Sequence, residues 1–332
     1  RVIDELLSLT FSSARVDCTI VVLSQVPPGY VRSKQVKGRH LYYQVETLIF
    51  GQAVQRALFP ERYIVGCDSP SNALPSSYLE FLEAHNCPIL QMRYESAELA
   101  KISINMFLVS SVTTSNTLAE LCEEIGADWS EIVPALRLDR RIGQYAYLSP
   151  GLGISGGNLE RDLATLKSYA IRHSTDYGVV DAWIHNSMHR KNWLWKVLQK
   201  EGLGNHSGVR ICILGLTYKE NTHSIKNSPA INFIKNLQKF EVSAYDPCAP
   251  DNAISHNVKR VLSASDSMED ADVLVIATPW PEFSNISVNK IQQLMRGNII
   301  VDPYAVLDGV NLRSSGFIYY SLGSGNQSSD SK

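Results

Sequence analysis

The chain has 332 residues, of which 44% are hydrophobic and 19% are charged, and its formal net charge is −2. These values are ordinary for a globular protein of two or three domains and give no basic footprint for nucleic acid or an anionic membrane. No apolar run approaches the roughly 20 residues of a membrane-spanning helix. We therefore expect a soluble protein, and six scattered cysteines without Cys-x-x-Cys spacing fit a reducing, cytoplasmic setting.

The first part of the chain has the pattern of an open α/β sheet. Residues 18–23 form a β-branched run that meets a Pro-Pro-Gly turn, which predicts a buried parallel strand ending at a ligand-binding edge. Residues 63–66 predict another strand. No Gly-x-Gly-x-x-Gly turn, the device that holds a dinucleotide pyrophosphate at a helix N-terminus, follows a predicted strand in this part of the chain; the pattern occurs only at 151–156, in the glycine-rich loop.

One long helix is predicted from Ser96, as its cap, to Gly126, as its stop. Lys101 and Asn105 lie four residues apart in it, so an ammonium and an amide share one face and could present donors to a sugar hydroxyl or an oxyanion. The alternative is an ordinary solvated helix face. A shorter helix should begin at Asp128 or Ser130 and reach about Leu136.

A glycine-rich loop opens at Ser149 and leads into a helix near Asp162. Four glycines stand among residues 151–157, which indicates a backbone that must approach something closely. That partner is a ligand in the interpretation that we favour, and the alternative is a flexible connector. Connectors are usually rich in Ser, Pro and Lys, however, whereas this loop lies between two long helical patterns.

Residues 176–200 predict a single helix. His185 and His189 lie four apart in it, but Asn186 stands where a His-Glu-x-x-His zinc site needs glutamate, so we expect two surface histidines and no metal. Residues 202–208 read as a flexible linker. Beyond it, strands at 209–214, 242–245, 273–277 and 299–301 and a helix at 228–240 predict a second, smaller doubly wound domain, and the Ser/Gly/Asn-rich end should be disordered.

Several segments together resemble one enzyme family. Residues 149–162 are similar to Asn-Pro-Gly-x-Gly-Phe-Gly-Gly-Ser-Cys-Phe-Pro-Lys-Asp of the UDP-glucose/GDP-mannose dehydrogenases, and residues 138–143 to their Asp-x-Arg-Ile-Gly. Further matches are Ser-Gln-Val-Pro-Pro-Gly at 24–29, Ala-Glu-Leu-Ala-Lys at 97–101 and Leu-Gly-Leu-Thr-Tyr-Lys at 214–219. The resemblance runs nearly end to end, and it is the order of the motifs that makes it specific.

The resemblance implies an α/β fold with two Rossmann-like doubly wound domains, the first incomplete, joined by a central helical domain. We expect residues 1–94 to be the remnant of an NAD-binding domain, 95–201 the central dimerisation domain with the glycine loop, 202–324 the UDP-sugar domain and 325–332 a disordered tail. NAD should be the cofactor, although this stretch alone should bind it poorly. The expected partners are a nucleotide-sugar substrate and further copies of the chain, as a dimer or larger assembly.

The site residues are carried over by motif position. The catalytic positions implied are Glu46, Lys101, Asn105, Asn158 and Asp162. Substrate contacts are implied for Arg141, Tyr147, Gly151, Gly153 and Lys219, with Arg141 reaching substrate in the partner subunit. Cofactor contacts are implied for Gln25 and Lys226.

Four positions depart from the family pattern: Gln25, Phe50, Asn158 and Tyr304. The most consequential is Asn158, which stands where the family has the cysteine that traps the aldehyde as a thiohemiacetal, because an amide is no nucleophile. We expect either a C6 dehydrogenase whose oxidation stops at the aldehyde or follows a variant course, or a silent subunit that binds nucleotide-sugar or assists assembly. A 3-hydroxyacid or 6-phosphogluconate type dehydrogenase would not explain the glycine loop.

Overall fold

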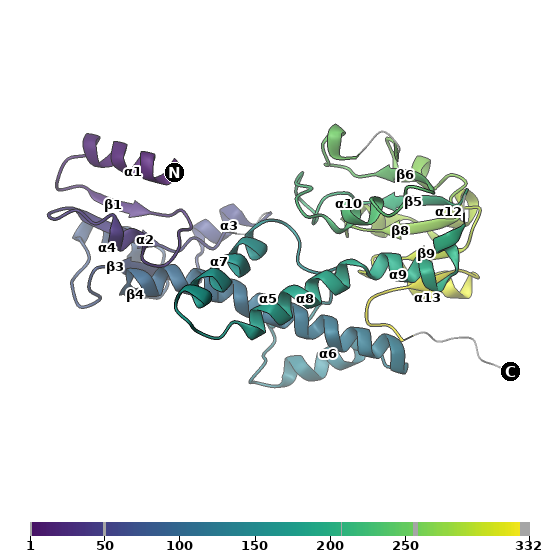
Figure 1. Ribbon diagram of the computed structural model, residues 1–332, viewed down its shortest axis with the longest axis horizontal. Helices are drawn as coiled ribbons and strands as arrows, with labels where there is room; N and C mark the ends of the chain where they lie inside the picture. The colour runs from purple at the N-terminus through teal and green to yellow at the C-terminus, as the bar shows by residue number, and fades with distance from the viewer. Residues whose placement is uncertain (1, 49–50, 207, 255–257, 326–332) are drawn as a thin grey trace. The chain divides into compact units, whose positions relative to one another are not determined.

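The computed structural model describes residues 2–48, 51–206, 208–254 and 258–325. The chain divides into two compact units, residues 1–106 and 107–332 (Figure 1). In the described ranges, no helix is both long enough and apolar enough to cross a membrane.

The first unit contains a four-stranded sheet in the order β1-β2-β3-β4. Its strands are β1 (Thr19–Val22), β2 (His40–Gln44), β3 (Tyr63–Cys67) and β4 (Ile89–Arg93). β2 and β3 run antiparallel, whereas the two outer pairs are parallel. The helices are α1 (Val2–Ser13), α2 (Tyr30–Ser33), α3 (Ala53–Leu58), α4 (Ser76–Glu83) and the first part of α5 (Tyr94–Ile125). α1 lies over β1, where Leu7 packs with Ile20 (Figure 1).

The second unit contains a six-stranded, fully parallel sheet in the order β10-β9-β8-β5-β6-β7. Its strands are β5 (Arg210–Leu214), β6 (Glu241–Tyr245), β7 (Val258–Arg260), β8 (Val273–Ile276), β9 (Ile299–Val301) and β10 (Ile318–Tyr320). The helices beside this sheet are α10 (Pro229–Ile234), α11 (Ala264–Met268), α12 (Val288–Leu294) and α13 (Gly309–Ser314), with 3-10 turns at Asp251–Ala253 and Pro281–Asn285. The strand order reverses at β5, so the loops after β5 and β8 flank the switch point where ligands bind in such sheets.

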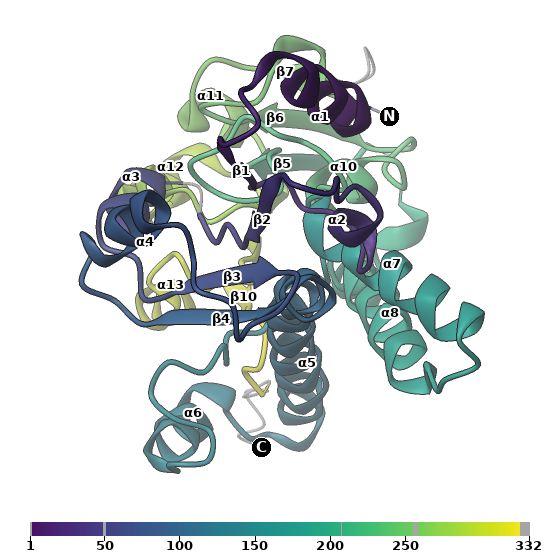
Figure 2. The ribbon, with the colours of Figure 1, turned by 90° about the vertical axis from the view of Figure 1, so that its left-hand side faces the viewer.

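Helices that precede the second sheet in sequence complete this unit. They are the second part of α5, α6 (Trp129–Leu138), α7 (Asn158–Arg172), α8 (Gly178–Lys191) and α9 (Trp193–Lys200). Asp128 caps α6 by accepting a hydrogen bond from the Ser130 N–H at 2.7 Å. Figure 2 shows α6 beside the second half of α5, where Trp129 packs against Ala119 and Cys122.

The predicted fold class is confirmed: the chain has two α/β sheets, one mixed and one parallel, and a helical region lies between them in sequence. The strands expected at 18–23, 63–66, 209–214, 242–245, 273–277 and 299–301 are present within a residue or two. Strands β2, β4, β7 and β10 had no counterpart in the prediction, because three of them carry charged or polar residues that weaken a β pattern.

Three predicted helices have different bounds. α5 begins at Tyr94 rather than after Ser96, since Tyr94 follows β4 directly and its hydroxyl donates to the Leu41 carbonyl at 2.5 Å. The predicted helix 176–200 is two helices, broken by a turn at Asn192, after which Leu194 and Leu198 are buried in the core. The predicted helix 228–240 ends at Ile234 and continues as tighter turns.

Two predicted irregular segments are partly ordered. The linker at 202–208 contains a 3-10 turn, Leu203–Asn205, and its residue 207 lies outside the described residues. Gly325, assigned to a disordered tail, donates its N–H to the Ala127 carbonyl at 2.9 Å. A Cβ at Gly325 would meet that oxygen at 2.7 Å, so glycine is what lets this segment approach the turn between α5 and α6. Residues 326–332 of the predicted tail lie outside the described residues.

Asp246, which follows β6, organises the ligand-binding edge of the second sheet. Its buried carboxylate accepts six hydrogen bonds, from the N–H groups of Leu216, Thr217, Cys248 and Ala249, the Thr217 hydroxyl and the Trp280 indole. These donors come from the segments that follow β5, β6 and β8. One carboxylate therefore fixes the three segments that shape this edge.

We expect Asp246→Ala to lower the free energy of unfolding by about 3 kcal/mol or more, because several buried donors lose their acceptor at once. Asp246→Asn should lower the free energy of unfolding less, because one side-chain oxygen remains as an acceptor. The amide nitrogen that replaces the other oxygen would still face N–H donors. Urea denaturation measures both. Asp251→Ala, at a fully exposed carboxylate, is the control and should change stability by less than about 0.5 kcal/mol. An Asp246→Ala variant as stable as this control would contradict the assignment.

Candidate functional site

The glycine-rich loop between α6 and α7 is held by side chains from two helices. The Gly151 N–H donates to the Asn116 amide oxygen of α5 at 2.8 Å, and Asn116 is fully buried. The Ile154 N–H donates to the Ser187 hydroxyl of α8, also at 2.8 Å. Buried polar groups of this kind are normally satisfied by defined partners, and here the partners fix the course of the loop.

Three of the four glycines lie close to other parts of the protein. A Cβ at Gly153, whose φ is +78°, would meet the Ser187 carbonyl oxygen at 2.4 Å. At Gly156 it would meet the Tyr218 ring at 2.9 Å, and at Gly157 the Lys226 ammonium at 2.9 Å. At Gly151, by contrast, no atom lies within 4 Å of that position. The close approach inferred from the sequence is therefore mainly to α8 and to the segment between β5 and α10.

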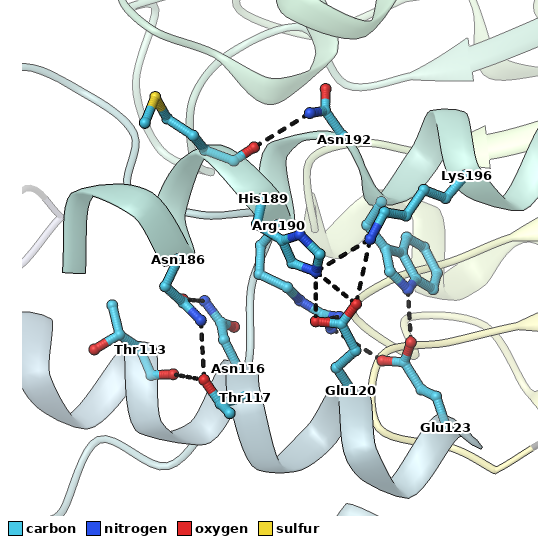
Figure 3. Close-up of polar contacts among 12 residues, drawn as sticks. Thr113, Asn116, Thr117, Glu120, Glu123, Asn186, His189, Arg190, Asn192 and Lys196 are labelled. Atoms are coloured by element: carbon cyan, nitrogen blue, oxygen red, sulfur yellow. Dashed lines mark hydrogen bonds and ion pairs between the residues drawn. The ribbon is translucent and has the colours of Figure 1, made fainter. Parts of the chain in front are cut away.

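A polar seam joins α8 to α5 and so positions Ser187 (Figure 3). It consists of Asn116, Thr117, Glu120 and Glu123 on α5 and Asn186, His189, Arg190, Trp193 and Lys196 on α8 and α9. Arg190 is fully buried and pairs with Glu123 at 2.9 Å. His189, predicted to lie at the surface, is partly buried because it bonds Glu120 at 2.7 Å, whereas His185 is exposed.

Asn158 and Asp162 lie on the first turns of α7, directly after the loop. Asn158 is the first residue of the helix and is exposed, whereas Asp162, four residues later, is 1% exposed. The same spacing places the two side chains on one face of the helix. Arg161 lies 3.6 Å from the Asp162 carboxylate. The structure thus presents an amide at a helix N-terminus with a buried carboxylate behind it.

Lys219 and Lys226 lie on the segment between β5 and α10, at the switch point of the second sheet. The Lys219 ammonium lies 5.8 Å from the centre of the Tyr218 ring. Tyr304, which follows β9, is half-buried. Burial raises the pKa of its hydroxyl, and the Glu220 and Asp302 carboxylates add to the rise. This edge therefore combines two lysines with buried aromatic surface.

The first unit holds the other predicted catalytic residues. Gln25 and Glu46 follow the parallel strands β1 and β2, so both lie at the carboxyl edge of that pair. Lys101 and Asn105 lie on α5, about 10 Å or more along the helix from Tyr94, and Asn105 is buried. The predicted pairing of these two side chains on one helical face agrees with α5 being continuous from Tyr94 to Ile125.

Glu98 anchors the Pro-Pro-Gly turn after β1 and was missed by the sequence analysis. Its fully buried carboxylate accepts the N–H groups of Gly29 at 2.5 Å and Val31 at 2.8 Å. Burial raises the pKa of Glu98, and these two N–H groups oppose the rise. The N–H groups at the start of α2 are therefore already taken by a protein carboxylate.

Arg141 and Tyr147 lie exposed on the segment between α6 and the loop. Arg141 pairs with Asp139 at 2.6 Å, and its hydrogen bonds lower the pKa of that carboxyl. Phe50, one of the departures from the family pattern, lies outside the described residues. Within the described ranges, no cluster of three or more His, Cys, Asp or Glu side chains could hold a metal ion.

The sequence analysis also missed Asn116, Ser187, Lys191 and Asn227, which hold the loop or the start of α7. One signal was available for Asn116 and Ser187, because each is a polar residue at a helical position that the apolar stripe would otherwise occupy. No local pattern marks Lys191 or Asn227, since their partners lie 31 and 71 residues away in sequence.

Comparisons with known proteins agree with this arrangement. Residues 95–187 match the central domain of the UDP-glucose/GDP-mannose dehydrogenase family, and residues 212–309 match its UDP binding domain. A UDP-glucose 6-dehydrogenase of Rickettsia conorii is 32% identical over 327 residues, which cover 95% of this chain and 75% of the relative. One of Bacillus subtilis is 30% identical over 319 residues, or 92% of this chain and 68% of the relative.

A solved structure shows the same fold. The UDP-glucose dehydrogenase of the hyperthermophilic archaeon Pyrobaculum islandicum superposes with a TM-score of 0.79 at 24% identity, over 93% of this chain and 71% of the other. The resemblance predicted from the sequence motifs is thereby confirmed. This chain belongs to the UDP-glucose/GDP-mannose dehydrogenase family, a family of NAD-dependent nucleotide-sugar dehydrogenases.

Proposed function

We propose that this protein is a nucleotide-sugar 6-dehydrogenase of the UDP-glucose type in which Asn158 prevents the ordinary covalent route from aldehyde to acid. The observation that carries the proposal is the exposed amide of Asn158 at the first turn of α7, one helical turn before the buried Asp162 carboxylate. The names of the relatives and the match of residues 212–309 to a UDP binding domain support the substrate class.

The two oxidation steps make different demands on position 158. Oxidising the C6 alcohol removes a hydride from carbon and a proton from oxygen, and neither transfer needs a nucleophilic side chain. The aldehyde reaches the acid in this family by attack of a thiolate, which forms a carbon–sulfur bond that an amide cannot form. The first step can therefore survive in this chain while the second loses its usual route.

The remaining polar groups suit the first step. We assign Lys101 and Asn105 to the C6 oxygen, as an ammonium and an amide that donate hydrogen bonds to it. Glu46 and Asp162 would orient water or take up the proton. The nucleotide-sugar would be contacted by Tyr147, Gly151, Gly153 and Lys219. Arg141 would reach the nucleotide-sugar bound to a partner subunit.

NAD accepts the hydride when it is bound. Gln25, after β1, and Lys226, after β5, are the residues of this chain that we expect to contact it. The start of α2 does not fit the pyrophosphate, because Glu98 already accepts the Gly29 and Val31 N–H groups. We assign residues 1–94 to cofactor binding, 95–201 to the central domain and 202–324 to nucleotide-sugar binding. We place the protein in the cytoplasm, where its six free cysteines would stay reduced.

A second candidate function is a silent subunit that binds nucleotide-sugar or assists an active partner. Four departures at family functional positions favour it: Gln25, Phe50, Asn158 and Tyr304. Against it stand five polar residues kept at the matching positions: Glu46, Lys101, Asn105, Asp162 and Lys219. A pocket without a reaction to perform would have little reason to keep all five, so we favour the enzyme.

The proposed assembly is a homodimer built on α5. Leu118, Leu121 and Ile125 follow a 3.5-residue spacing near its C-terminal end, Phe107 lies three turns before them, and the four are between 40% and 78% exposed. Exposed apolar side chains on one helix are a surface by which helices pair. A second copy of this chain, with the same surface, is the partner that fits.

The stoichiometry of NADH to UDP-glucose tests the function. In the full-length gene product we expect one NADH per sugar and an aldehyde product from the wild type, and two NADH per sugar from Asn158→Cys, because a thiol at a helix N-terminus is readily ionised. Two NADH per sugar from the wild type would refute the role given to Asn158. Sugar binding without any NADH, in both proteins, would establish the silent subunit.

The oligomeric state tests this surface on α5. We expect Leu121→Glu combined with Ile125→Glu to give a monomer in light scattering coupled to gel filtration, because the charges would be buried unpaired at the interface. Val310→Glu on α13, an apolar residue that is 76% exposed elsewhere in the same unit, is the control and should leave the assembly unchanged. A double variant with the wild-type mass would exclude this interface.

A further inference from the structure

One carboxylate on the first turn of α7 joins three separate segments. The Glu160 carboxylate accepts a hydrogen bond from the Lys191 ammonium of α8 at 2.8 Å and another from the Asn227 amide, on the segment between β5 and α10. The side chains of Glu160 and Lys191 are 33% and 19% exposed. This ion pair is therefore less screened by water than an ordinary surface pair.

The segment between β5 and α10 also forms two hydrogen bonds with the loop that precedes α7. The Asn227 amide also donates to the Gly156 carbonyl at 2.8 Å, and the Gly156 N–H donates to the Lys226 carbonyl at 3.1 Å. Asn227 has a φ of +54°, a conformation that asparagine tolerates better than most residues. The backbone of Gly156 thus has both its donor and its acceptor bound by two consecutive residues.

Packing adds to these hydrogen bonds. The Tyr218 ring lies against Gly156 and the Lys226 side chain against Gly157, each so close that a Cβ on the glycine would collide with it. Gly157 is the residue that immediately precedes α7. The segment between β5 and α10 is therefore in close contact with the residues that lead into α7, which carries Asn158.

Glu160 is not part of the family motif. The family segment to which residues 149–162 are similar has proline where Glu160 stands, and proline can accept neither of these two hydrogen bonds. The connection through Glu160 is thus a feature of this chain, adjacent to its substitution at position 158.

We propose that Glu160, Lys191 and Asn227 form a clamp that couples occupancy of the nucleotide site between β5 and α10 to the order and position of the first turn of α7. These three are positioning residues: they would act through the placement of Asn158 rather than by touching the reacting atoms. The inference rests on the proposed nucleotide site, because Lys219 on that segment is its expected ligand. Occupancy there would hold the segment, and the clamp would transmit the restraint to α7.

Hydrogen–deuterium exchange of the full chain with and without UDP tests the coupling. We expect UDP to slow exchange at residues 215–226, through direct binding, and by about fivefold at residues 155–163, through the clamp. In Glu160→Pro and in Asn227→Gly the first effect should remain and the second should be lost. Proline is tolerated in the first turn of a helix, and glycine keeps the positive φ at position 227, so both variants can fold.

The matched control is Asp181→Asn, which removes another ion pair between α7 and α8, Lys167 with Asp181 at 2.6 Å, away from the loop. It should behave as the wild type does. Protection of 155–163 that persists in both clamp variants overturns the proposal, since the loop would then sense UDP directly. UDP that protects 215–226 but not 155–163 in the wild type overturns the clamp alone. UDP that protects neither segment overturns the proposed nucleotide site and, with it, the coupling.

Discussion

Four of the seven residues from Gly151 to Gly157 are glycines, so the course of this loop depends on its two buried side chains, Leu152 and Ile154, and on the segments packed against it. On one side lies α8, whose Ser187 both accepts the Ile154 N–H and excludes a Cβ at Gly153. On the other lies the segment after β5, whose Tyr218 and Lys226 exclude a Cβ at Gly156 and Gly157. Glycine here lets α8 and the segment after β5 pack closely against the loop backbone.

This arrangement works only if α8 is itself fixed. The polar seam with α5 provides that, because Arg190 is buried and bonded to Glu123, which also accepts the Trp193 indole N–H and the Gly323 N–H. A buried charge is costly unless it is paired in good geometry, so the seam favours one register of α8 along α5. Ser187 and Lys191, on another face of α8, then stand at defined positions beside the loop.

Much of the fold could be predicted from local pattern, because strands such as β5 and β8 are continuous apolar runs bounded by turns. The motifs also identified the family. What could not be predicted depends on distant contacts: Tyr94 starts α5 by bonding Leu41, and Gly325 is ordered by Ala127. The glycine pattern in the loop predicted a close approach correctly, but it could not show whether the neighbour is a ligand or another part of the protein.

The first turn of α7 carries its negative charge on Glu160. A helix N-terminus favours an anion, through its unpaired N–H groups and the helix dipole. In the family motif a cysteine at this place can use that preference as a thiolate. In this chain the residue is a neutral amide, and the first-turn anion is Glu160, already bound to Lys191 and Asn227. The negative charge at the start of α7 therefore lies on a side chain that joins the helix to α8 and to the segment after β5.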